Sequence, residues 1–121
     1  MPRFVLLEHL WGGIHWDLML EDGEALRTWA IDAPVVAGHD LPARALPDHR
    51  RIYLDYEGDI SGGRGRVRRI DAGTYCARLW SAALVRVRLE GVQLVGEAEL
   101  RQVGENSDGA SSWSFRLGNL D

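Results

Sequence analysis

Two histidines and an aspartate near the N-terminus are the side chains best suited to chemistry. His15 and Asp17 form an H-x-D pair, and on a strand both would lie on one face, roughly 7 Å apart at the backbone. His9 precedes Gly12-Gly13, which permits a tight chain reversal, so a hairpin would bring it to the pair. Two imidazoles and a carboxylate, with positions left open for water and substrate, form a common catalytic site for zinc, manganese or iron.

The same pattern also has a purely structural explanation. Histidines on strand faces are more often surface or hydrogen-bonded residues than metal ligands, and a single H-x-D pair is a weak signal. Met19 shares the face of His15 and Asp17, which indicates that this face is not fully exposed to solvent. The residue types alone therefore leave a metal site and a solvated polar face both open.

A third histidine is a candidate for proton transfer. His49 follows Asp48 and precedes Arg50, and Tyr53 comes four residues later. A histidine beside arginines can act as a general acid or contact a phosphoryl oxygen. The alternative is a loop histidine whose ring is oriented by Asp48. The remaining histidine, His39, lies among turn residues without an evident partner and receives no role.

The charge distribution separates one segment from the rest of the chain. The net charge is −4 over 121 residues, which argues against a protein that coats nucleic acid indiscriminately. All 14 basic residues are arginines, and seven of them lie in residues 44–69 against four acidic residues. Arginine forks match phosphate oxygens, so this segment predicts either a phosphate-binding patch or a solvated face.

A glycine-rich run lies inside the same segment, at residues 61–66 (S-G-G-R-G-R). Glycines let backbone N–H groups approach an anion, as in phosphate-cradling loops. The run lacks the spacing and the lysine of a P-loop, and no helix is predicted after it. A plain turn between strands is therefore the more frequent explanation.

Period-two alternation of apolar and polar residues recurs through the chain, while long helical periods are missing. Residues 32–49 contain three prolines and are predicted to be a long irregular connection, and residues 105–111 a loose polar segment. Eight or nine short strands favour an all-β, mainly antiparallel fold, a compact closed or nearly closed barrel in a single domain, residues 1–121. The strands are predicted at residues 3–9, 14–21, 25–31, 52–56, 65–70, 74–79, 83–89, 92–101 and 112–117.

Other features of the sequence bear on the compartment. The single cysteine, Cys76, excludes an internal disulfide and fits a reducing cytoplasm. No apolar run approaches the roughly 20 residues needed to cross a bilayer. The apolar stretch at the N-terminus is short and interrupted by Glu8 and His9, so it is not expected to be a signal peptide. We therefore expect a cytoplasmic protein without a membrane partner.

These segments together resemble the 3′-phosphoesterase domain of bacterial and archaeal DNA ligase D, also called the DNA polymerase/ligase N-terminal domain. The stretch at residues 14–21 (I-H-W-D-L-M-L-E) is similar to the family's L-H-Y-D-F-R-L-E, and residues 29–31 (W-A-I) to its W-A-V. Residues 48–58 are similar to D-H-P-L-D-Y-x-x-F-E-G, and the opening strand ends in a histidine in both. The resemblance covers nearly the whole chain, here as a stand-alone domain.

The resemblance implies a compact β-barrel with a specific activity. That activity is the metal-dependent removal of a 3′-phosphate or 3′-ribonucleotide from a DNA primer end, usually with manganese, zinc being the alternative. By the resemblance His9, His15 and Asp17 hold the ion, His49 contacts the scissile phosphate or protonates the leaving oxygen, and Tyr53 assists. DNA or RNA–DNA 3′ ends are the implied substrates, and an end-joining ligase or polymerase the implied partner.

The chain also departs from the family pattern, at positions that would bind phosphate. Met19, Ala33 and Leu41 stand where the family has basic residues. Each lost charged contact would weaken binding by about 1.5–3 kcal/mol. Arg64 and Arg66 could supply a substitute phosphate clamp. Two alternatives therefore stay open: a non-catalytic nucleic-acid-binding or docking module of a repair system, and a metal hydrolase acting on a different ester.

Overall fold

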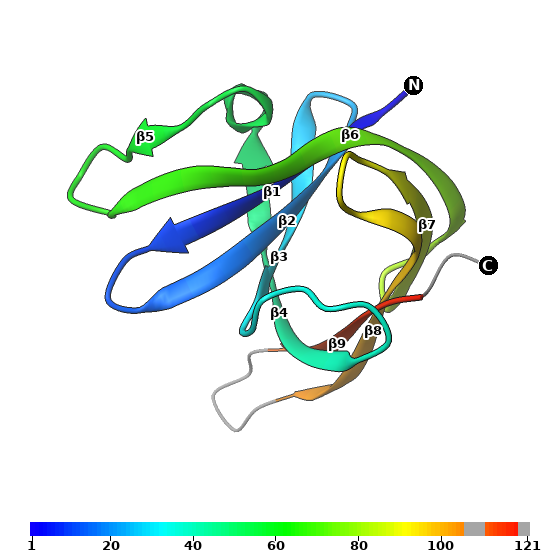
Figure 1. Ribbon diagram of the computed structural model, residues 1–121. Coiled ribbons are helices and arrows are strands. Elements are labelled where there is room, and N and C mark those ends of the chain that lie inside the picture. Colours follow the sequence, from blue (N-terminus) through cyan, green and yellow to red (C-terminus); the bar gives the residue numbers. More distant parts are fainter. Residues whose placement is uncertain (106–110, 119–121) are drawn as a thin grey trace.

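The computed structural model describes residues 1–105 and 111–118, which form nine strands and one short 3₁₀ helix (Figure 1). This part of the chain contains no α-helix, and hence no helix long and apolar enough to cross a membrane. The elements are β1 (Arg3–Leu10), β2 (Ile14–Asp22), β3 (Ala25–Ile31), β4 (Asp40–Arg50), η1 (Arg51–Leu54), β5 (Gly58–Asp59), β6 (Arg66–Trp80), β7 (Leu84–Glu90), β8 (Val95–Glu105) and β9 (Ser111–Leu117).

Eight of the strands close into an antiparallel barrel. The order is β1-β2-β3-β4-β9-β8-β7-β6, and β6 also pairs with β1, while β5 pairs with β6 alone. Strand β6 can serve two neighbours because it is 15 residues long and arches over the molecule (Figure 1). Its first part pairs with β1 and its second part with β7. The prediction of a closed antiparallel barrel of about eight strands is confirmed.

Alternation along the strands produces two apolar clusters on opposite faces of the barrel wall. Phe4 and Leu6 of β1 belong to the larger cluster, which fills the barrel and includes the edge-to-face pair Trp29–Trp113, with ring centroids 5.7 Å apart. The intervening side chains face outward and form a second cluster beneath η1 and β5. Its buried members are Val5, Leu7, Met19, Leu26, Leu54 and Val67. The wall at β1 and β2 is thus covered on both faces.

The predicted irregular connection is wrong over much of its length, because residues 40–50 form β4. Prolines indicated a loop, yet both prolines of β4 occupy positions that tolerate the missing N–H. Pro42 is still bonded through its carbonyl oxygen, which accepts a hydrogen bond from Asp32 N at 2.9 Å. Pro47 lies where the β3–β4 register shifts and beyond Asp40–Arg44, the part of β4 that pairs with β9. Only residues 32–39 remain an irregular connection.

Other predicted boundaries also change. The strand predicted at residues 52–56 is wrong, because Arg51–Leu54 form η1 and residues 55–57 belong to no strand. The strands expected at 65–70 and 74–79 are one continuous strand, β6, with a register shift against β1. The predicted hairpin of residues 83–101 is confirmed as β7 and β8. Most of the predicted loose segment, 105–111, lies outside the described residues.

A buried carboxylate holds the β7–β8 turn against β6. The side chain of Asp71 is only 4% exposed. Its two oxygens accept four backbone N–H groups at 2.7–3.0 Å, which satisfies the charge entirely with main-chain donors. The donors are Ala72, Val92, Gln93 and Leu94.

Candidate metal centre

Pairing of β1 with β2 brings the three N-terminal candidates together. His9 lies directly opposite His15 in the antiparallel register, and Asp17 is two residues further along β2. The turn between the strands contains Gly12 and Gly13 with φ of 64° and 150°, values that favour glycine. The hairpin expected from the spacing is therefore present, and all three side chains lie on the outer face of the wall.

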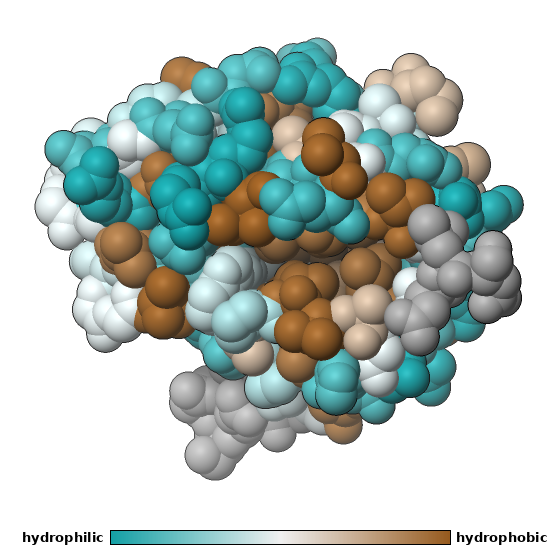
Figure 2. All heavy atoms as spheres, viewed as in Figure 1, coloured by the Kyte–Doolittle hydropathy of each residue, from teal (hydrophilic) through white to brown (hydrophobic). Residues whose placement is uncertain are grey.

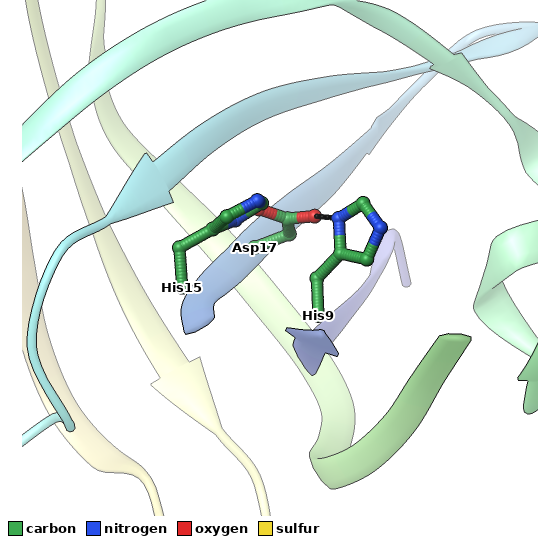
Figure 3. A group of neighbouring side chains, drawn as sticks. All are labelled: His9, His15 and Asp17. Carbon is green, nitrogen blue, oxygen red and sulfur yellow. Dashed lines mark hydrogen bonds and ion pairs between the residues drawn. The ribbon is translucent and has the colours of Figure 1, made fainter. Parts of the chain in front are cut away.

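The three side chains converge closely enough to share one ion (Figure 3). His15 Nδ1 lies 2.6 Å from Asp17 Oδ1, and His9 Nδ1 lies 3.4 Å from Asp17 Oδ2. One ligand atom from each residue lies within 4.8 Å of the others. Asp17 is 2% exposed and His9 9%, which confirms that this polar face is shielded from solvent.

A main-chain contact indicates the tautomer of the His9 ring. The ring nitrogen Nε2 lies 2.8 Å from the carbonyl oxygen of Arg64, an atom that can only accept, so Nε2 carries a proton. In the neutral ring, Nδ1 then directs its lone pair at the Asp17 carboxylate. Two electron-rich atoms face each other stably only with a cation between them, either a proton or a metal ion. The donor set of His9, His15 and Asp17 therefore fits a divalent cation.

The candidate metal-binding group, His9, His15 and Asp17, forms one wall of a cavity of about 690 Å³, which His49 and Tyr53 also line. His49 comes from the end of β4, and its Nδ1 donates a hydrogen bond to the carbonyl oxygen of Pro47 at 2.9 Å. Its ring packs edge-to-face on Tyr53 of η1, with centroids 5.8 Å apart. The fold thus brings both residues to the same cavity as the predicted metal ligands.

Of the two predicted phosphate-binding residues, Arg64 lies in the turn before β6 and borders the cavity, whereas Arg66, on β6, does not. Arg64 lines the cavity, and so does Val67. Arg66 directly precedes Val67 on β6 and therefore points to the opposite face. Met19 forms an apolar part of the cavity wall, whereas Leu41 packs against the barrel interior.

The cavity is also lined by two arginines that were not predicted to be site residues. Arg44 and Arg50 both come from β4. The register places Arg44 in a row with Asp17, because Ala30 of β3 pairs with both residues. Alternation along β4 would have revealed Arg44 if the segment had been predicted to be a strand. Trp11, at the tip of the β1–β2 hairpin, also lines the cavity, and no function was predicted for it from the sequence.

Comparison with known families agrees with this geometry. The model of the DNA ligase D 3′-phosphoesterase domain matches residues 8–102. The chain belongs to this family. The matched region contains each of the cavity-lining candidates, from His9 to Arg64. A comparison with curated proteins gives no significant match.

Proposed function

We propose that this family member is a metal-dependent phosphoesterase that removes a 3′-phosphate or 3′-ribonucleotide from a DNA primer end. The observation that carries the proposal is the meeting of His9, His15 and Asp17 with His49 and Tyr53 in one cavity. The product would be a 3′-hydroxyl end, which an end-joining polymerase or ligase can use.

His9, His15 and Asp17 would hold the ion, and manganese is the favoured metal because of the family, with zinc as the alternative. A divalent ion bound there supplies Lewis acidity that polarises a phosphoryl oxygen. The Arg64 carbonyl keeps the His9 ring in one tautomer and orientation. Such outer contacts typically alter metal affinity or activity by about 10–100-fold when they are lost.

His49 is suited to move a proton on the other side of the cavity. Its Nδ1 is engaged by the Pro47 carbonyl, so Nε2 is the nitrogen left to meet the substrate. In the protonated ring Nε2 would donate to a phosphoryl oxygen or to the leaving oxygen. The Tyr53 hydroxyl would add a second hydrogen bond, since its ring packs against His49.

Arginines provide the anion selectivity that the departures at Met19 and Leu41 would otherwise remove. Arg44, Arg50 and Arg64 line the cavity, against the carboxylates of Asp17 and Asp48. Arg44 is held by an exposed ion pair with Asp32, at 3.4 Å, which a phosphate dianion could displace. Three arginines in the lining of a cavity that also holds a candidate metal site suit a phosphoester better than a neutral ester.

The test is a primer-end assay with purified protein. A 5′-labelled DNA primer carrying a 3′-phosphate, and a second one ending in a 3′-ribonucleotide, are incubated with manganese, zinc or EDTA. We expect metal-dependent conversion to a 3′-hydroxyl end, lost in His9→Ala and His15→Ala and retained in Asp40→Asn. Asp40 is an apt control because its exposed carboxylate pairs with Arg116 away from the cavity. Metal binding without turnover of either primer would contradict the proposal.

One observation favours a second candidate, hydrolysis of an ester without phosphate. Met19 gives the cavity wall an apolar part next to Asp17, at a position where a thioether cannot bind a phosphate dianion. Carboxylic esters and phosphate esters assayed side by side separate the two activities. A gel-shift series in rising salt addresses the non-catalytic alternative, which requires DNA binding at low ionic strength without turnover.

A further inference from the structure

Trp11 stands beside the metal-binding group with most of its surface in solvent. It is 55% exposed, although it lines the cavity. Its ring stacks on the ring of His9, with centroids 6.0 Å apart and planes inclined by 25°. Leu10 and Ile14 are also exposed, and hydrophobic residues lie over the outer end of this hairpin, at the left of Figure 2. An exposed indole that belongs to an exposed apolar patch and also borders a cavity with metal-binding potential calls for a functional explanation.

The backbone of Trp11 is held from two sides. Its N–H donates to the Gly13 carbonyl at 3.0 Å within the β1–β2 turn. Gly65, in the turn before β6, lies so close that a Cβ there would stand 1.8 Å from the carbonyl oxygen of Leu10 and 2.8 Å from Trp11 Cβ. The indole is therefore presented at a defined place beside the cavity.

The surroundings of Trp11 indicate what it would contact. Its neighbour His9 belongs to the metal-binding group, and Arg64, whose carbonyl bonds His9, also lines the cavity. A phosphate bound between these residues would lie next to the indole. In a nucleoside 3′-phosphate only the sugar separates the phosphate from the base, so the base can reach the indole surface that His9 leaves uncovered. Stacking on an aromatic side chain is a common way to hold a single-stranded base.

We propose that Trp11 is a specificity-determining residue that stacks on the base of the terminal nucleotide whose 3′-phosphate occupies the cavity. The inference rests on the proposed function and narrows it, because it assigns nucleoside 3′-phosphates, rather than simple phosphate monoesters, as the preferred ligands. Trp11 then supplies sequence-tolerant recognition, since every base has a planar face.

The test measures binding with manganese present and before turnover, by stopped-flow fluorescence anisotropy. Two short labelled single-stranded DNAs are compared, one ending in thymidine 3′-phosphate and the other in an abasic sugar 3′-phosphate. We expect the base-bearing end to bind about 5- to 150-fold more tightly, the equivalent of about 1–3 kcal/mol for one stacked base. In Trp11→Ala this ratio should fall to near one, whereas Trp11→Phe should keep much of it.

Leu10→Ala is the matched control, because Leu10 is an exposed apolar neighbour on the same hairpin tip that does not line the cavity. Its ratio should equal that of the unaltered protein. A ratio near one in the unaltered protein, no binding of either DNA, or an unchanged ratio in Trp11→Ala would each overturn the inference. If Trp11→Ala changed only the oligomeric state seen by sedimentation, the hairpin tip would be a protein contact, and this result would also overturn the inference.

The outcomes keep this inference separate from the proposed function. Primer hydrolysis without preference for the base-bearing end removes the stacking role and leaves the phosphoesterase. Base discrimination that depends on Trp11, without hydrolysis of either primer, removes the phosphoesterase and leaves a module that binds DNA 3′ ends.

Discussion

Among the described residues, two aspartates are buried, and they are satisfied in opposite ways. Asp71, 4% exposed, accepts four backbone N–H groups from its own strand and the β7–β8 turn. Asp17, 2% exposed, instead faces the side chains of His9 and His15 and borders a cavity. Both carboxylates are buried to a similar extent, yet their partners differ in kind.

The difference shows that the type of partner, rather than the degree of burial, distinguishes a carboxylate with a structural role from one suited to bind a metal ion. Backbone amides cannot titrate or bind metal, so Asp71 can only hold the turn. The turn also leaves no space around it, because a Cβ on Gly91 would stand 2.4 Å from Asp71 Oδ2. Imidazoles can exchange a proton for a metal ion, so the carboxylate of Asp17 takes part in a site that can change its occupant.

The largest expected effect concerns Asp17. Asp17→Asn keeps the shape of the side chain but removes the charge that a divalent ion requires, so primer hydrolysis should fall by about 10³-fold. The free energy of unfolding without metal should change much less, because no backbone donor loses its acceptor. Steady-state rates and denaturant unfolding of the same preparation measure both quantities.

The comparison predicts the reverse for Asp71. In Asp71→Asn the new amide group would meet two backbone N–H donors where a carboxylate oxygen had accepted them, which should lower the free energy of unfolding by about 3 kcal/mol. The rate per folded molecule should stay near that of the unaltered protein. If Asp71→Asn impaired turnover and Asp17→Asn impaired folding, the assignment of the two roles would be wrong.

Metal addition should stabilise the protein only where Asp17 keeps its carboxylate, and Asp71 should not matter. An ion that binds only the folded state at 100 times its Kd adds about 2.7 kcal/mol to the free energy of unfolding. Thermal unfolding with manganese and with EDTA should therefore differ for the unaltered protein and for Asp71→Asn. Asp17→Asn should show the same Tm in both buffers, and a metal-dependent shift in that variant would place the ion elsewhere.

The smallest effect concerns a buried hydroxyl on β6. Burial, reinforced by the carboxylates of Asp22 and Glu21, raises the pKa of Tyr75 to about 12, and its hydroxyl donates to the Glu21 carbonyl at 2.6 Å. Folding thus favours the protonated phenol. Its contribution is complete below pH 10 and should be lost as the pH rises to about 12, lowering stability by about 1–2 kcal/mol once solvent screening is counted.

The absence of lysine makes this effect accessible, because no ammonium group titrates in the same range. Tyrosine absorbance at alkaline pH should show one phenol that ionises near pH 12 and that is missing in Tyr75→Phe. Unfolding measured from pH 9 to 12 should lose part of its pH dependence in Tyr75→Phe. An identical slope in that variant would assign the alkaline instability to other groups.

Short-range pattern was enough to predict the hairpin of His9, His15 and Asp17, because alternation and the Gly12-Gly13 turn are local properties. His49 and Tyr53 were candidates from their residue types, but only the family resemblance put them in the same site, because no spacing rule connects them to β1 and β2. Strand β4 was missed because prolines are compatible with a strand only at bulges and edges, and those depend on neighbouring strands. Arg44 was missed with it.

Barrel closure also could not be derived in detail from the sequence. Strand β6 pairs with β1 and with β7, and its two halves resemble separate strands because the register against β1 shifts near Leu6 and Leu7. Such a register is set by contacts across dozens of residues. The position of Trp11 beside His9 likewise depends on Gly65, more than 50 residues away along the chain.

The candidate metal-binding group lies on the outer surface of the barrel wall, and this position has an evolutionary consequence. Along β1, Phe4 and Leu6 belong to the filled interior, while His9 belongs to the outer face that carries the candidate site. Mutations that repack the interior and mutations that retune the exterior therefore affect different side chains of the same strands. A lineage could exchange its substrate by altering residues such as Met19 or Trp11 while inheriting an unchanged framework.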